Sequence, residues 1–448
     1  MTITEEPRRG TAKQVPFAMR SPLHVPRERY FDRHFFELEK ELLWPRVWQM
    51  ACRLEEIPSP GDFVEYEICD QSIIVVRQED ASVKAFHNAC RHRATQLCKG
   101  SGRVTGGQIR CSFHGWRWNL DGSPSLLYGR EGFDEECLQP DDVRLQECRV
   151  DTWGACAWIN LDPNARPLRE ALSPAAEILE AFGVDDLRVY WWKEVIIPAN
   201  WKLAQEAFHE GWHVMATHPQ LTIGAGEAYR PDSAEYTVFE NGHARFQGAE
   251  RSTDGVNVPK ARSAHGFLES MRLLWEGQDA MVLERDLRVF EGVRTRVGAD
   301  EDYPAAAIKA LLEYATGAGV PLRATPESMR LWGGEVFLFP NFFYLPMYSN
   351  SLSYRVRPYN DDPEMCRFEV WSLTMPAAGQ DVPRARLKGR FAPDDTENWG
   401  RIPRQDFSNL ERQQRGLHSR SFKEHRLATE WERAISNMHE ELDRYLAG

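Results

Sequence analysis

Hydrophobic and polar positions change their spacing along the chain. Residues 27–48 have apolar side chains three and four positions apart, which predicts a helix. From residue 58 the pattern changes to short alternating runs between glycine-bearing turns, which is typical of strands. The runs are 62–68, 72–77, 83–88, 109–111, 117–120 and 155–160. We therefore expect an all-β domain over residues 45–162.

The helical pattern returns beyond residue 162. The helices that it predicts cover 168–181, 200–217, 307–314 and 407–446. Pro198 stands just ahead of the second of these, and Pro219 ends it. Extended runs predict strands over 189–197, 334–344, 352–357 and 367–373, whereas residues 225–330 look mixed. The second domain, 163–448, is therefore predicted to be α+β, with an antiparallel sheet and separate helices.

Composition and charge are those of a globular protein with an acidic surface. Lys and Arg total 55 against 67 Asp and Glu, a net charge of −12, which argues against nucleic acid or an anionic membrane as the main partner. Residues 1–20 predict a mobile polar tail without a secretory signal. Prolines interrupt the apolar stretch 335–348 too early for a membrane helix. Nine cysteines in such a chain predict free thiols or metal ligands in a reducing cytoplasm.

Two pairs of Cys and His lie in the predicted β domain. Cys90 and His92 form a C-x-H pair, and Cys111 and His114 form a C-x-x-H pair. Two thiolates and two imidazoles could bind tetrahedral zinc, but zinc fingers usually pair Cys with Cys and His with His. One Cys and one His on each of two loops instead allow both thiolates to bind one iron and both imidazoles the other, as in a Rieske [2Fe–2S] cluster. We therefore predict that these four residues hold such a cluster.

A second group of ligand-type residues lies in the helix predicted over 200–217. At about 100° per residue, the side chains on one face are Glu206, His209, Glu210 and His213. His218 reaches the same metal as His213 only if the helix loosens near its end, and Pro219 disfavours α geometry at the residue before it. Two histidines and a carboxylate form the facial triad of non-haem Fe(II) oxygenases, which leaves three coordination positions for O₂ and other ligands.

Both groups resemble the metal sites of Rieske non-haem iron oxygenases, in the catalytic α subunit of the aromatic-ring-hydroxylating dioxygenase family. The runs that carry the resemblance are Cys90-Arg91-His92-Arg93, Cys111-Ser112-Phe113-His114-Gly115-Trp116, and Asn200-Trp201-Lys202 followed by H-x₄-H. The resemblance implies that His213 and His218 bind Fe(II). It also implies that Asp406 is the third ligand, because residues 405–417 read Gln-Asp-Phe-Ser-Asn-Leu-Glu-Arg-Gln-Gln-Arg-Gly-Leu, similar to the family's downstream helix.

The resemblance also implies an architecture and partners. A Rieske domain would cover 45–162, a helix-grip-like catalytic domain 163–448, and a helix at 21–44 would pack on the catalytic domain. Electrons would come from a separate NAD(P)H-dependent reductase, directly or through a ferredoxin, because no G-x-G-x-x-G loop follows a strand. A head-to-tail homotrimer would let Glu210 bridge the iron-bound His of one subunit to a cluster His of its neighbour. The presence of a β subunit stays open.

Two residues depart from the family's pattern. Glu210 stands where most members have Asp, and Ala207 stands where many ring dihydroxylases have Asn. The Glu resembles a subset of members that act as monooxygenases or demethylases without a small β subunit, and both changes argue against cis-dihydroxylation. Monohydroxylation, oxidative dealkylation and cis-dihydroxylation therefore all stay open. An aromatic substrate in an apolar pocket is the default, and alicyclic or quaternary-ammonium substrates, which aromatic rings could hold, are alternatives.

Two other functions compete with the oxygenase. Residues 209–213 read H-E-x-x-H, the helix motif of zinc metalloproteases, in which His209 and His213 would bind zinc and Glu210 would activate water. Gly211 would weaken that helix, and the upstream cluster would have no purpose. The other alternative is an electron-transfer protein whose second domain only binds a partner. An oxygenase accounts for both groups of residues at once.

Other histidines and aromatic residues are predicted to have structural roles. His418 and His425 lie in the predicted closing helix and are expected to be solvated. In the family, the sheet that floors the active site includes the positions of Phe337, Phe339, Phe342, Phe343 and Tyr344. Some of these rings should line the pocket.

Overall fold

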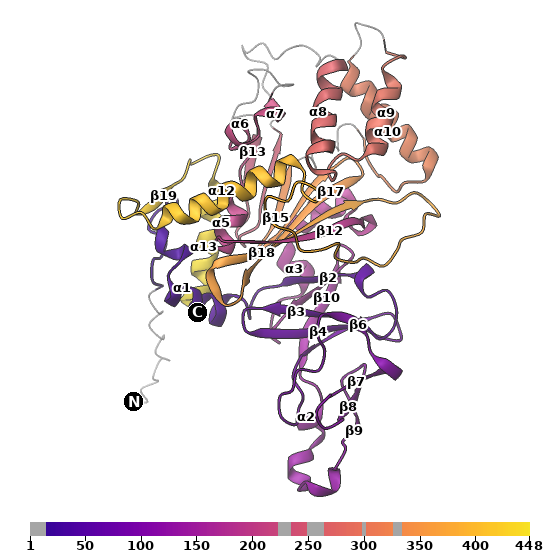
Figure 1. Cartoon of the computed structure of the whole chain (residues 1–448), viewed down its shortest axis with the longest axis vertical. Helices are drawn as coiled ribbons and strands as arrows, with labels where there is room; N and C mark the ends of the chain where they lie inside the picture. Colours follow the sequence, from indigo (N-terminus) through magenta and orange to yellow (C-terminus); the bar gives the residue numbers. More distant parts are fainter. Residues whose placement is uncertain (1–14, 223–233, 249–263, 298–301, 326–333) are drawn as a thin grey trace, which may run out of the picture.

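The computed structural model describes residues 15–222, 234–248, 264–297, 302–325 and 334–448 (Figure 1). Most of the predicted mobile tail and parts of the mixed stretch 225–330 lie outside these residues. Within the described chain, two antiparallel seven-stranded sheets dominate the fold. The predicted fold class, a β domain followed by an α+β domain, is confirmed.

The first sheet forms the N-terminal β domain. Its strands, in spatial order, are β2 (Gln49–Arg53), β11 (Cys156–Asn160), β10 (Glu147–Trp153), β5 (Val83–His87), β4 (Gln71–Arg77), β3 (Asp62–Ile68) and β6 (Ser101–Arg103). A three-stranded sheet extends this domain: β7 (Gln108–Arg110), β8 (Arg117–Asn119) and β9 (Pro124–Leu126). The smaller sheet lies toward one end of the molecule's longest axis, far from α8, α9 and α10 at the other end (Figure 1).

The second sheet belongs to the second domain of the chain. Its strands, in spatial order, are β12 (Arg188–Ile197), β18 (Asp362–Thr374), β17 (Asn350–Tyr359), β16 (Phe342–Met347), β15 (Glu335–Leu338), β14 (Ala244–Gly248) and β13 (Ala234–Val238). Strand alternation gives the sheet two apolar faces. One face, with Phe337, Phe343 and Tyr354, packs in one core with Trp201 and Phe407 of the helices above it. Because both faces are covered, the strands are buried along most of their length.

Most of the helices lie beside this second sheet, whereas α2 belongs to the N-terminal β domain (Figure 1). They are α1 (Arg33–Leu38), α2 (Pro140–Val143), α3 (Leu168–Leu172), α4 (Ala175–Phe182), α5 (Trp201–Glu206), α6 (Val214–Thr217), α7 (Pro219–Thr222), α8 (Ala264–Gln278), α9 (Glu284–Val293), α10 (Tyr303–Ala318), α12 (Arg401–Leu417) and α13 (Arg433–Ala447). Short helical turns are η1 (Arg27–Tyr30), η2 (Glu39–Leu43), η3 (Leu54–Glu56), η4 (Thr105–Gly107), η5 (Arg130–Gly132), η6 (Glu135–Leu138) and η7 (Val184–Asp186). Helices α8, α9 and α10 share a separate apolar core.

The predicted strands are confirmed, with one division. Each predicted run coincides with a strand to within a few residues, but 334–344 forms two strands, β15 and β16, joined through Pro340. The predicted boundaries at 45 and 163 stay predictions. The first domain's sheet begins at Gln49 and ends at Asn160, inside the predicted range.

The sequence predicts long continuous helices, and the structure interrupts them, so the predicted continuity is wrong. Residues 27–48 form three short pieces, η1, α1 and η2, because the Asp32 side chain accepts a bond from the Phe35 amide (2.8 Å) and starts α1 afresh. Pro174 divides the helix predicted over 168–181 into α3 and α4. The predicted closing helix is two helices, α12 and α13, separated by the strand β19 (Glu424–Arg426), which pairs with β1 (His24–Pro26). Periodicity did not show this pairing, since β1 lies 400 residues away.

The two closing histidines differ in exposure. His418 follows α12 with an exposed side chain that contacts Glu364, as expected. His425 lies on β19, where its ring stacks on Tyr30 with centroids 4.8 Å apart, and burial lowers its pKa to about 4. The prediction that His425 is solvated is therefore wrong.

Arg355 connects the two large sheets. Its guanidinium forms a bidentate ion pair with Glu369 (2.7 Å for both contacts) and donates to the carbonyls of Met50 (2.6 Å) and Ala51 (2.8 Å) on β2. Burial raises the pKa of Glu369, but Arg355 and Arg357 lower it to about 2, so the carboxylate stays charged. A fully bonded buried arginine therefore holds the N-terminal domain against the catalytic sheet.

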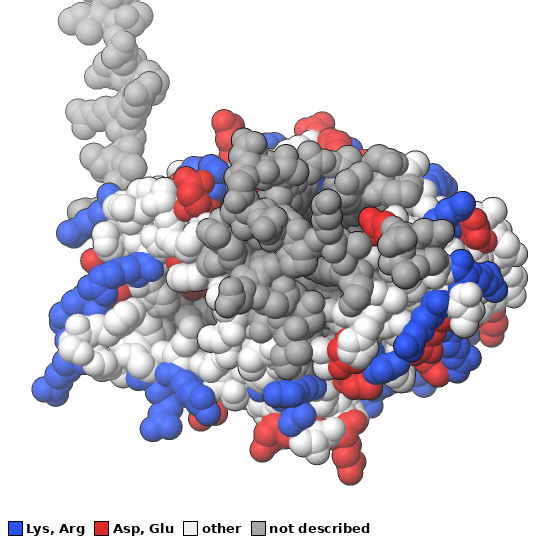
Figure 2. All heavy atoms as spheres, turned by 90° about the horizontal axis from the view of Figure 1, so that it is seen from above, with Lys and Arg blue, Asp and Glu red and all other residues white. Residues whose placement is uncertain are grey.

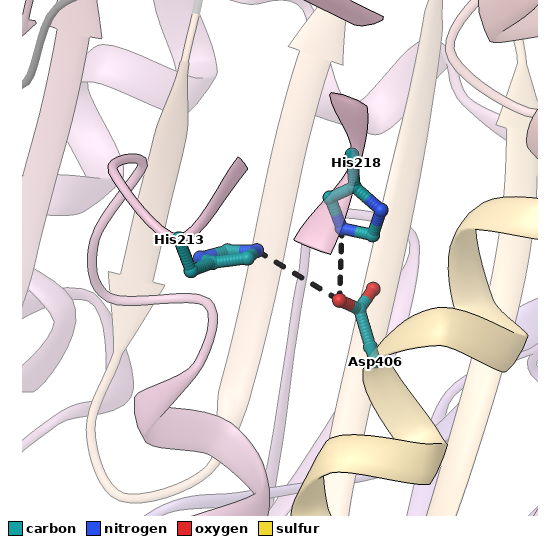
Figure 3. A group of neighbouring side chains, drawn as sticks. All are labelled: His213, His218 and Asp406. Carbon is teal, nitrogen blue, oxygen red and sulfur yellow. Dashed lines mark ion pairs between the residues drawn. The ribbon is translucent and has the colours of Figure 1, made fainter. Parts of the chain in front are cut away.

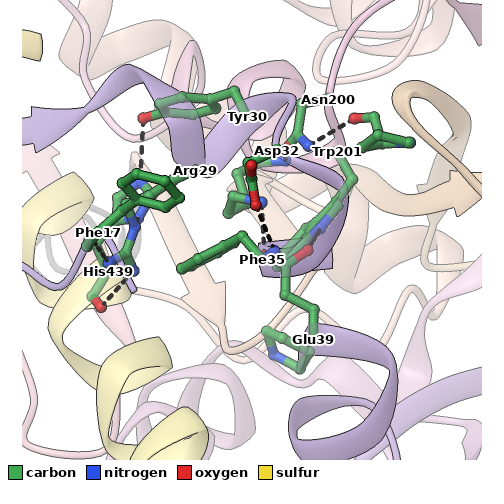
Figure 4. A network of polar contacts seen from close by, with 12 residues as sticks. Phe17, Arg29, Tyr30, Asp32, Phe35, Glu39, Asn200, Trp201 and His439 are labelled. Atoms are coloured by element: carbon green, nitrogen blue, oxygen red, sulfur yellow. Dashed lines mark hydrogen bonds and ion pairs between the residues drawn. The ribbon is translucent and has the colours of Figure 1, made fainter. Parts of the chain in front are cut away.

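A second buried network holds the start of α5 (Figure 4). Lys202 and Glu39 form an ion pair of 2.6 Å with both side chains fully buried, and Glu39 also accepts from the indole N–H of Trp201 (3.1 Å). One turn later, Glu206 accepts from the hydroxyl of Tyr30 (2.9 Å) and lies 2.8 Å from Nε2 of His439 on α13. The N-terminal segment, α5 and α13 are thereby connected through buried polar contacts.

Figure 2 shows Lys and Arg intermixed with Asp and Glu around the edge of the described surface. Neither positive nor negative charge alone covers this face. Among the described helices, none combines the length and the apolar character that a membrane crossing requires.

Replacing Glu39 by Gln should destabilise the catalytic domain by about 3–5 kcal/mol, because Lys202 would keep a buried charge without its carboxylate. The midpoint of thermal unfolding, followed by circular dichroism, should fall by roughly 10 °C. Glu41→Gln, at an exposed position of the same segment, is the matched control and should leave the midpoint unchanged. Equal midpoints for the two variants would contradict the importance of the pair.

Candidate metal centres

The two loops that carry the Cys and His pairs have the same hydrogen-bonding pattern. One loop follows β5, and the other connects β7 to β8. In each loop the fourth residue after the Cys donates its amide to the Cys carbonyl, from Ala94 to Cys90 (2.9 Å) and from Gly115 to Cys111 (3.1 Å). Ala94 and Gly115 both have left-handed backbones, with φ of 57° and 75°. The loops are therefore two copies of one turn, and each presents a thiol and an imidazole.

The two imidazoles face each other at the tip of the domain. The ring centroids of His92 and His114 are 4.6 Å apart, and His92 stacks on Trp116 at 5.0 Å. The Nδ1 atom of His92 is buried and has no hydrogen-bond partner among the described residues. An unpartnered ring nitrogen beside a second imidazole is what a metal ligand requires.

The two cysteines are free thiols that interact with each other. Burial raises the pKa of Cys111, but the amides of His114 and Phe113 point at its sulfur and lower the pKa overall. Burial also raises the pKa of Cys90, against the effect of the His92 amide. Two adjoining sulfurs and two adjoining imidazoles fit a [2Fe–2S] cluster with thiolates on one iron and imidazoles on the other.

The second centre combines two short helices with α12 (Figure 3). His213 precedes α6 and His218 follows it, whereas Asp406 projects from the buried side of α12. Oδ1 of Asp406 lies 2.9 Å from Nε2 of His218 and 3.8 Å from Nε2 of His213. The ligand atoms of all three residues lie within 4.8 Å of one another, which makes the group suitable for one metal ion. His218 has non-helical angles just before Pro219, so the predicted loosening is confirmed.

Further side chains orient the two histidine rings. Nδ1 of His213 lies 2.7 Å from Oε1 of Glu210, and Nδ1 of His218 lies 3.0 Å from Oε1 of Gln405. Gln220 donates to the same oxygen of Gln405 (2.7 Å). Burial lowers the pKa of His213, but the hydrogen bond and charge of Glu210 raise it overall. With Nδ1 occupied, each ring presents Nε2 toward Asp406, as metal-binding histidines do.

The helix predicted over 200–217 is interrupted in its middle. Helix α5 ends at Glu206, and Glu210 accepts the amides of Trp212 (2.6 Å) and His213 (2.9 Å) with Oε2. These side-chain bonds replace backbone helix bonds, so the expectation that Glu206, His209, Glu210 and His213 share one helix face is wrong. Glu206 instead joins the buried network with Tyr30 and His439.

The H-E-x-x-H interpretation requires His209 and His213 on one helix. Because α5 ends at Glu206, these two residues do not have that arrangement. His209 turns toward the sheet, where its ring contacts Phe337 (4.2 Å between centroids) and Phe343 (5.1 Å). Among the described residues, the ligand-type side chains that gather closely enough for one metal ion are His213, His218 and Asp406. His209 is not one of them.

Sequence reasoning missed the residues that support the ligands. Gln405 adjoins Asp406 in the chain, but no spacing pattern distinguishes an amide that orients a histidine from a surface amide. Asn409 donates to the hydroxyl of Thr217 (3.2 Å) and thereby ties α12 to α6. Both contacts join segments almost 200 residues apart, so only the folded chain reveals them.

The fold combines two Cys–His loops suited to a [2Fe–2S] cluster with a group of two His and one Asp suited to one metal ion, as in Rieske-type proteins with a second, mononuclear metal site. Residues 47–128 match the Rieske [2Fe–2S] domain, and residues 184–448 match the family described as ring hydroxylating alpha subunit (catalytic domain). The chain therefore belongs to the family of Rieske non-haem iron oxygenase α subunits. It contains a Rieske [2Fe–2S] domain and a non-haem iron catalytic domain.

Characterised relatives share about half of the chain. The 2-aminobenzenesulfonate 2,3-dioxygenase subunit alpha of Alcaligenes sp is 29% identical over 248 residues, 51% of this chain and 61% of that protein. The carnitine monooxygenase oxygenase subunit of Escherichia coli (strain K12) is 30% identical over 247 residues, 54% of this chain and 64% of that protein. The chain thus spans less than two thirds of the length of these relatives.

Solved structures share the fold over almost the whole chain. Naphthalene 1,2-dioxygenase with indole bound has a TM-score of 0.70 at 18% identity and covers 98% of this chain and 95% of its own. A quaternary ammonium Rieske monooxygenase in complex with L-carnitine has a TM-score of 0.64 at 18% identity and covers 95% of this chain and 97% of its own.

Replacing Asp406 by Ala should remove the mononuclear iron and leave the cluster, because two histidines alone are a weak site for Fe(II). Iron analysis should fall from about three to about two per chain, with unchanged sulfide and an unchanged visible spectrum of the cluster. Glu411→Ala, an exposed carboxylate on the same helix, should keep all three irons. Full iron content in the Asp406 variant would exclude it as a ligand.

Proposed function

We propose that the chain is the oxygenase component of a Rieske non-haem iron oxygenase. The observation that carries the proposal is that one folded chain brings together both groups of ligand-type residues, the two Cys–His loops and the group of His213, His218 and Asp406. We propose the last three as the iron ligands. When bound, the cluster supplies electrons one at a time and the mononuclear iron supplies open positions for O₂. In a monooxygenation, one oxygen atom enters a C–H bond of the substrate and the other leaves as water, which consumes two electrons and two protons.

The chain's own residues hold the site in place and keep it dry. Glu210 and Gln405 fix the orientation of the two imidazoles, so that both Nε2 atoms face Asp406, where these three residues would hold the iron. Rings of the sheet, including Phe337, Phe343 and Tyr354, are buried beneath this segment. An apolar floor excludes water and protects a reactive centre from side reactions.

The tip of the β domain presents exposed groups beside the cluster loops. His92 and His114 are partly exposed there, and the exposed ring of Phe113 lies 3.9 Å from the ring of His114. Tyr128 is 71% exposed beyond β9. Exposed aromatic rings suit contact with another protein, which in this proposal is the neighbouring chain of a ring. The electrons come from a separate NAD(P)H-dependent reductase, directly or through a ferredoxin.

We also propose that electrons cross between subunits of a homotrimer. The cluster loops and α6 lie toward opposite ends of the molecule's longest axis (Figure 1). Glu210, His213 and Asp406 line one cavity of about 300 Å³ beside α12, so a neighbouring chain could approach the iron ligands there. A head-to-tail ring would place the tip of one chain at this cavity of the next. Glu210 would then bridge the two centres, and its bond to His213 is the first half of that bridge.

The substrate is a small organic molecule, and monooxygenation is the favoured reaction. Ala207 lines the cavity beside the proposed iron ligands, so this position supplies no side-chain amide of the kind found in many ring dihydroxylases. The carnitine monooxygenase relative acts on a quaternary ammonium compound, and the 2-aminobenzenesulfonate relative acts on an aromatic one. Neither substrate class is excluded by the family. The zinc hydrolase and the simple electron carrier fit neither the ligand geometry nor the family, and we do not retain them.

The reducing cytoplasm remains the proposed location. It is supported by the nine cysteines, all of which are free thiols in the structure.

The test of the proposed function is metal and sulfide analysis of anaerobically purified protein, with electron paramagnetic resonance before and after dithionite. About three irons and two sulfides per chain, with a rhombic Rieske signal on reduction, are expected. Two irons without a mononuclear site would overturn the oxygenase in favour of an electron carrier. Zinc without sulfide would overturn the Rieske assignment.

Glu210→Gln should leave both metals bound but reduce the product formed per oxidised cluster by at least tenfold, because Gln keeps one acceptor oxygen and removes the charge. Single-turnover experiments with reduced protein measure this ratio. Glu210→Asp restores the charge and should recover part of the yield. A normal yield in the Gln variant would refute the bridging role.

A further inference from the structure

A cavity of about 490 Å³, which we call the interdomain cavity, lies between the two large sheets. One wall comes from β2, η3, β3 and residues 100–102 of the Rieske domain. The other wall comes from β12, β17, β18 and residues 384–387 of the catalytic domain. The described residues that line the cavity include none of the candidate metal ligands. A cavity of this size has room for a small metabolite at a place separate from both metal centres.

Positive charge dominates the wall that comes from the catalytic domain. Two carboxylates, Glu194 and Glu369, lie on this wall together with five arginines, Arg355, Arg357, Arg367, Arg384 and Arg386. Arg355 and Arg357 share the carboxylate of Glu369, at 2.7 Å and 2.9 Å. These three buried side chains therefore keep one net positive charge.

Arg357 is a buried cation with incomplete hydrogen bonding. It is 4% exposed, and its Nε atom has no hydrogen-bond partner among the described residues. Burial lowers the pKa of Arg357, although the charge of Glu369 acts in the opposite direction. Burying a charge without full compensation is costly, and a negative charge in the adjoining cavity would offset part of that cost.

Two further arginines have N–H groups available to a ligand in the cavity. Arg367 lies 3.6 Å from a carboxylate oxygen of Glu67 and 3.6 Å from one of Glu194, and both distances are too long for a hydrogen bond. Glu67 is also 56% exposed, so water screens its charge. Arg386 is exposed, and its guanidinium takes part in none of the hydrogen bonds or ion pairs of the described residues. Arginine binds a carboxylate through two parallel N–H groups, so these two arginines can bind two carboxylates.

The carboxyl groups of the cavity compete little for these arginines. Glu65 accepts from the backbone amide of Gly100 (2.7 Å), and Glu194 pairs with Arg390. Burial raises the pKa of Glu56 to about 7, so a large share of this carboxyl is neutral at pH 7. The local balance of charge therefore favours an anion in the cavity over a cation.

We propose that the interdomain cavity binds a small dicarboxylate, with one carboxylate at Arg367 and the other at Arg386. The ligand would lie against residues 100–102 of the Rieske domain and would thereby add contacts between the two domains. A dicarboxylate suits the cavity better than a monocarboxylate, because two arginines there have N–H groups without hydrogen-bond partners. The inference goes beyond the proposed function, since it assigns a second ligand to a site separate from the iron ligands.

The experiment compares succinate with butyrate, which has the same number of carbon atoms but one carboxylate. Isothermal titration calorimetry at constant ionic strength, on protein with both metals bound, measures the two affinities. Wild-type protein should bind succinate at least about tenfold more tightly than butyrate. Arg386→Gln and Arg367→Gln should each weaken succinate binding by at least about tenfold. Arg367→Lys should keep part of the affinity, because Lys retains the charge but not the two parallel N–H groups.

Arg420→Gln, at an exposed position outside the cavity, is the matched control and should keep the affinity for succinate. Asp406→Ala should also bind succinate as the wild type does, because Asp406 does not line the cavity. Equal affinity of the wild type for both probes, or a preference that survives Arg386→Gln, would overturn the inference. Loss of succinate binding in Asp406→Ala would overturn it as well, since succinate would then bind at the iron. Iron and sulfide content are measured on the same samples, so failure of the oxygenase proposal would appear as missing metal rather than as altered succinate binding.

Discussion

The fully buried ion pair between Lys202 and Glu39 determines where the iron-binding segment begins. A charge pair without access to water is stable only in one geometry, because each partner has lost its hydration and depends on the other. The pair therefore fixes the N-terminal segment and α5 together, and the contacts of Glu206 with Tyr30 and His439 extend the connection to α13. The position of the two histidines downstream depends on this fixed start.

Beyond α5, the segment brings His213 and His218 toward one point because it does not continue as a regular helix. A regular helix would point His213 and His218 in different directions, since five residues turn the chain by about 140° beyond a full turn. The non-helical angles of His218 before Pro219 resolve this conflict. Upstream of it, the two oxygens of Glu210 bind the backbone amides of Trp212 and His213 and the imidazole of His213. One carboxylate thus shapes the loop and orients the ligand. The same side chain lines the cavity beside the iron ligands, where we propose the approach of a second subunit.

The sequence predicted what depends on neighbouring residues and failed where distant contacts decide. The cluster ligands could be predicted because each pair lies on one short turn whose shape is local. Asp406 could be assigned only through the resemblance, since nothing in its own surroundings distinguishes it from a surface Asp. The prediction of a continuous helix over 200–217 was wrong. Periodicity shows where polar residues lie, but it cannot show that the side chain of Glu210 binds backbone amides.

The contacts of Arg355 between the two large sheets affect how the proposed oxygenase activity would depend on protein concentration. Because its guanidinium is bonded to Glu369 and to two carbonyls of β2, the Rieske domain is held against the catalytic sheet, with its cluster loops and α6 toward opposite ends of the molecule's longest axis. In the head-to-tail ring that we propose, contact between chains would then join the two centres. Dilution that separates the subunits of that ring would stop product formation, even when every subunit is folded and fully loaded with metal.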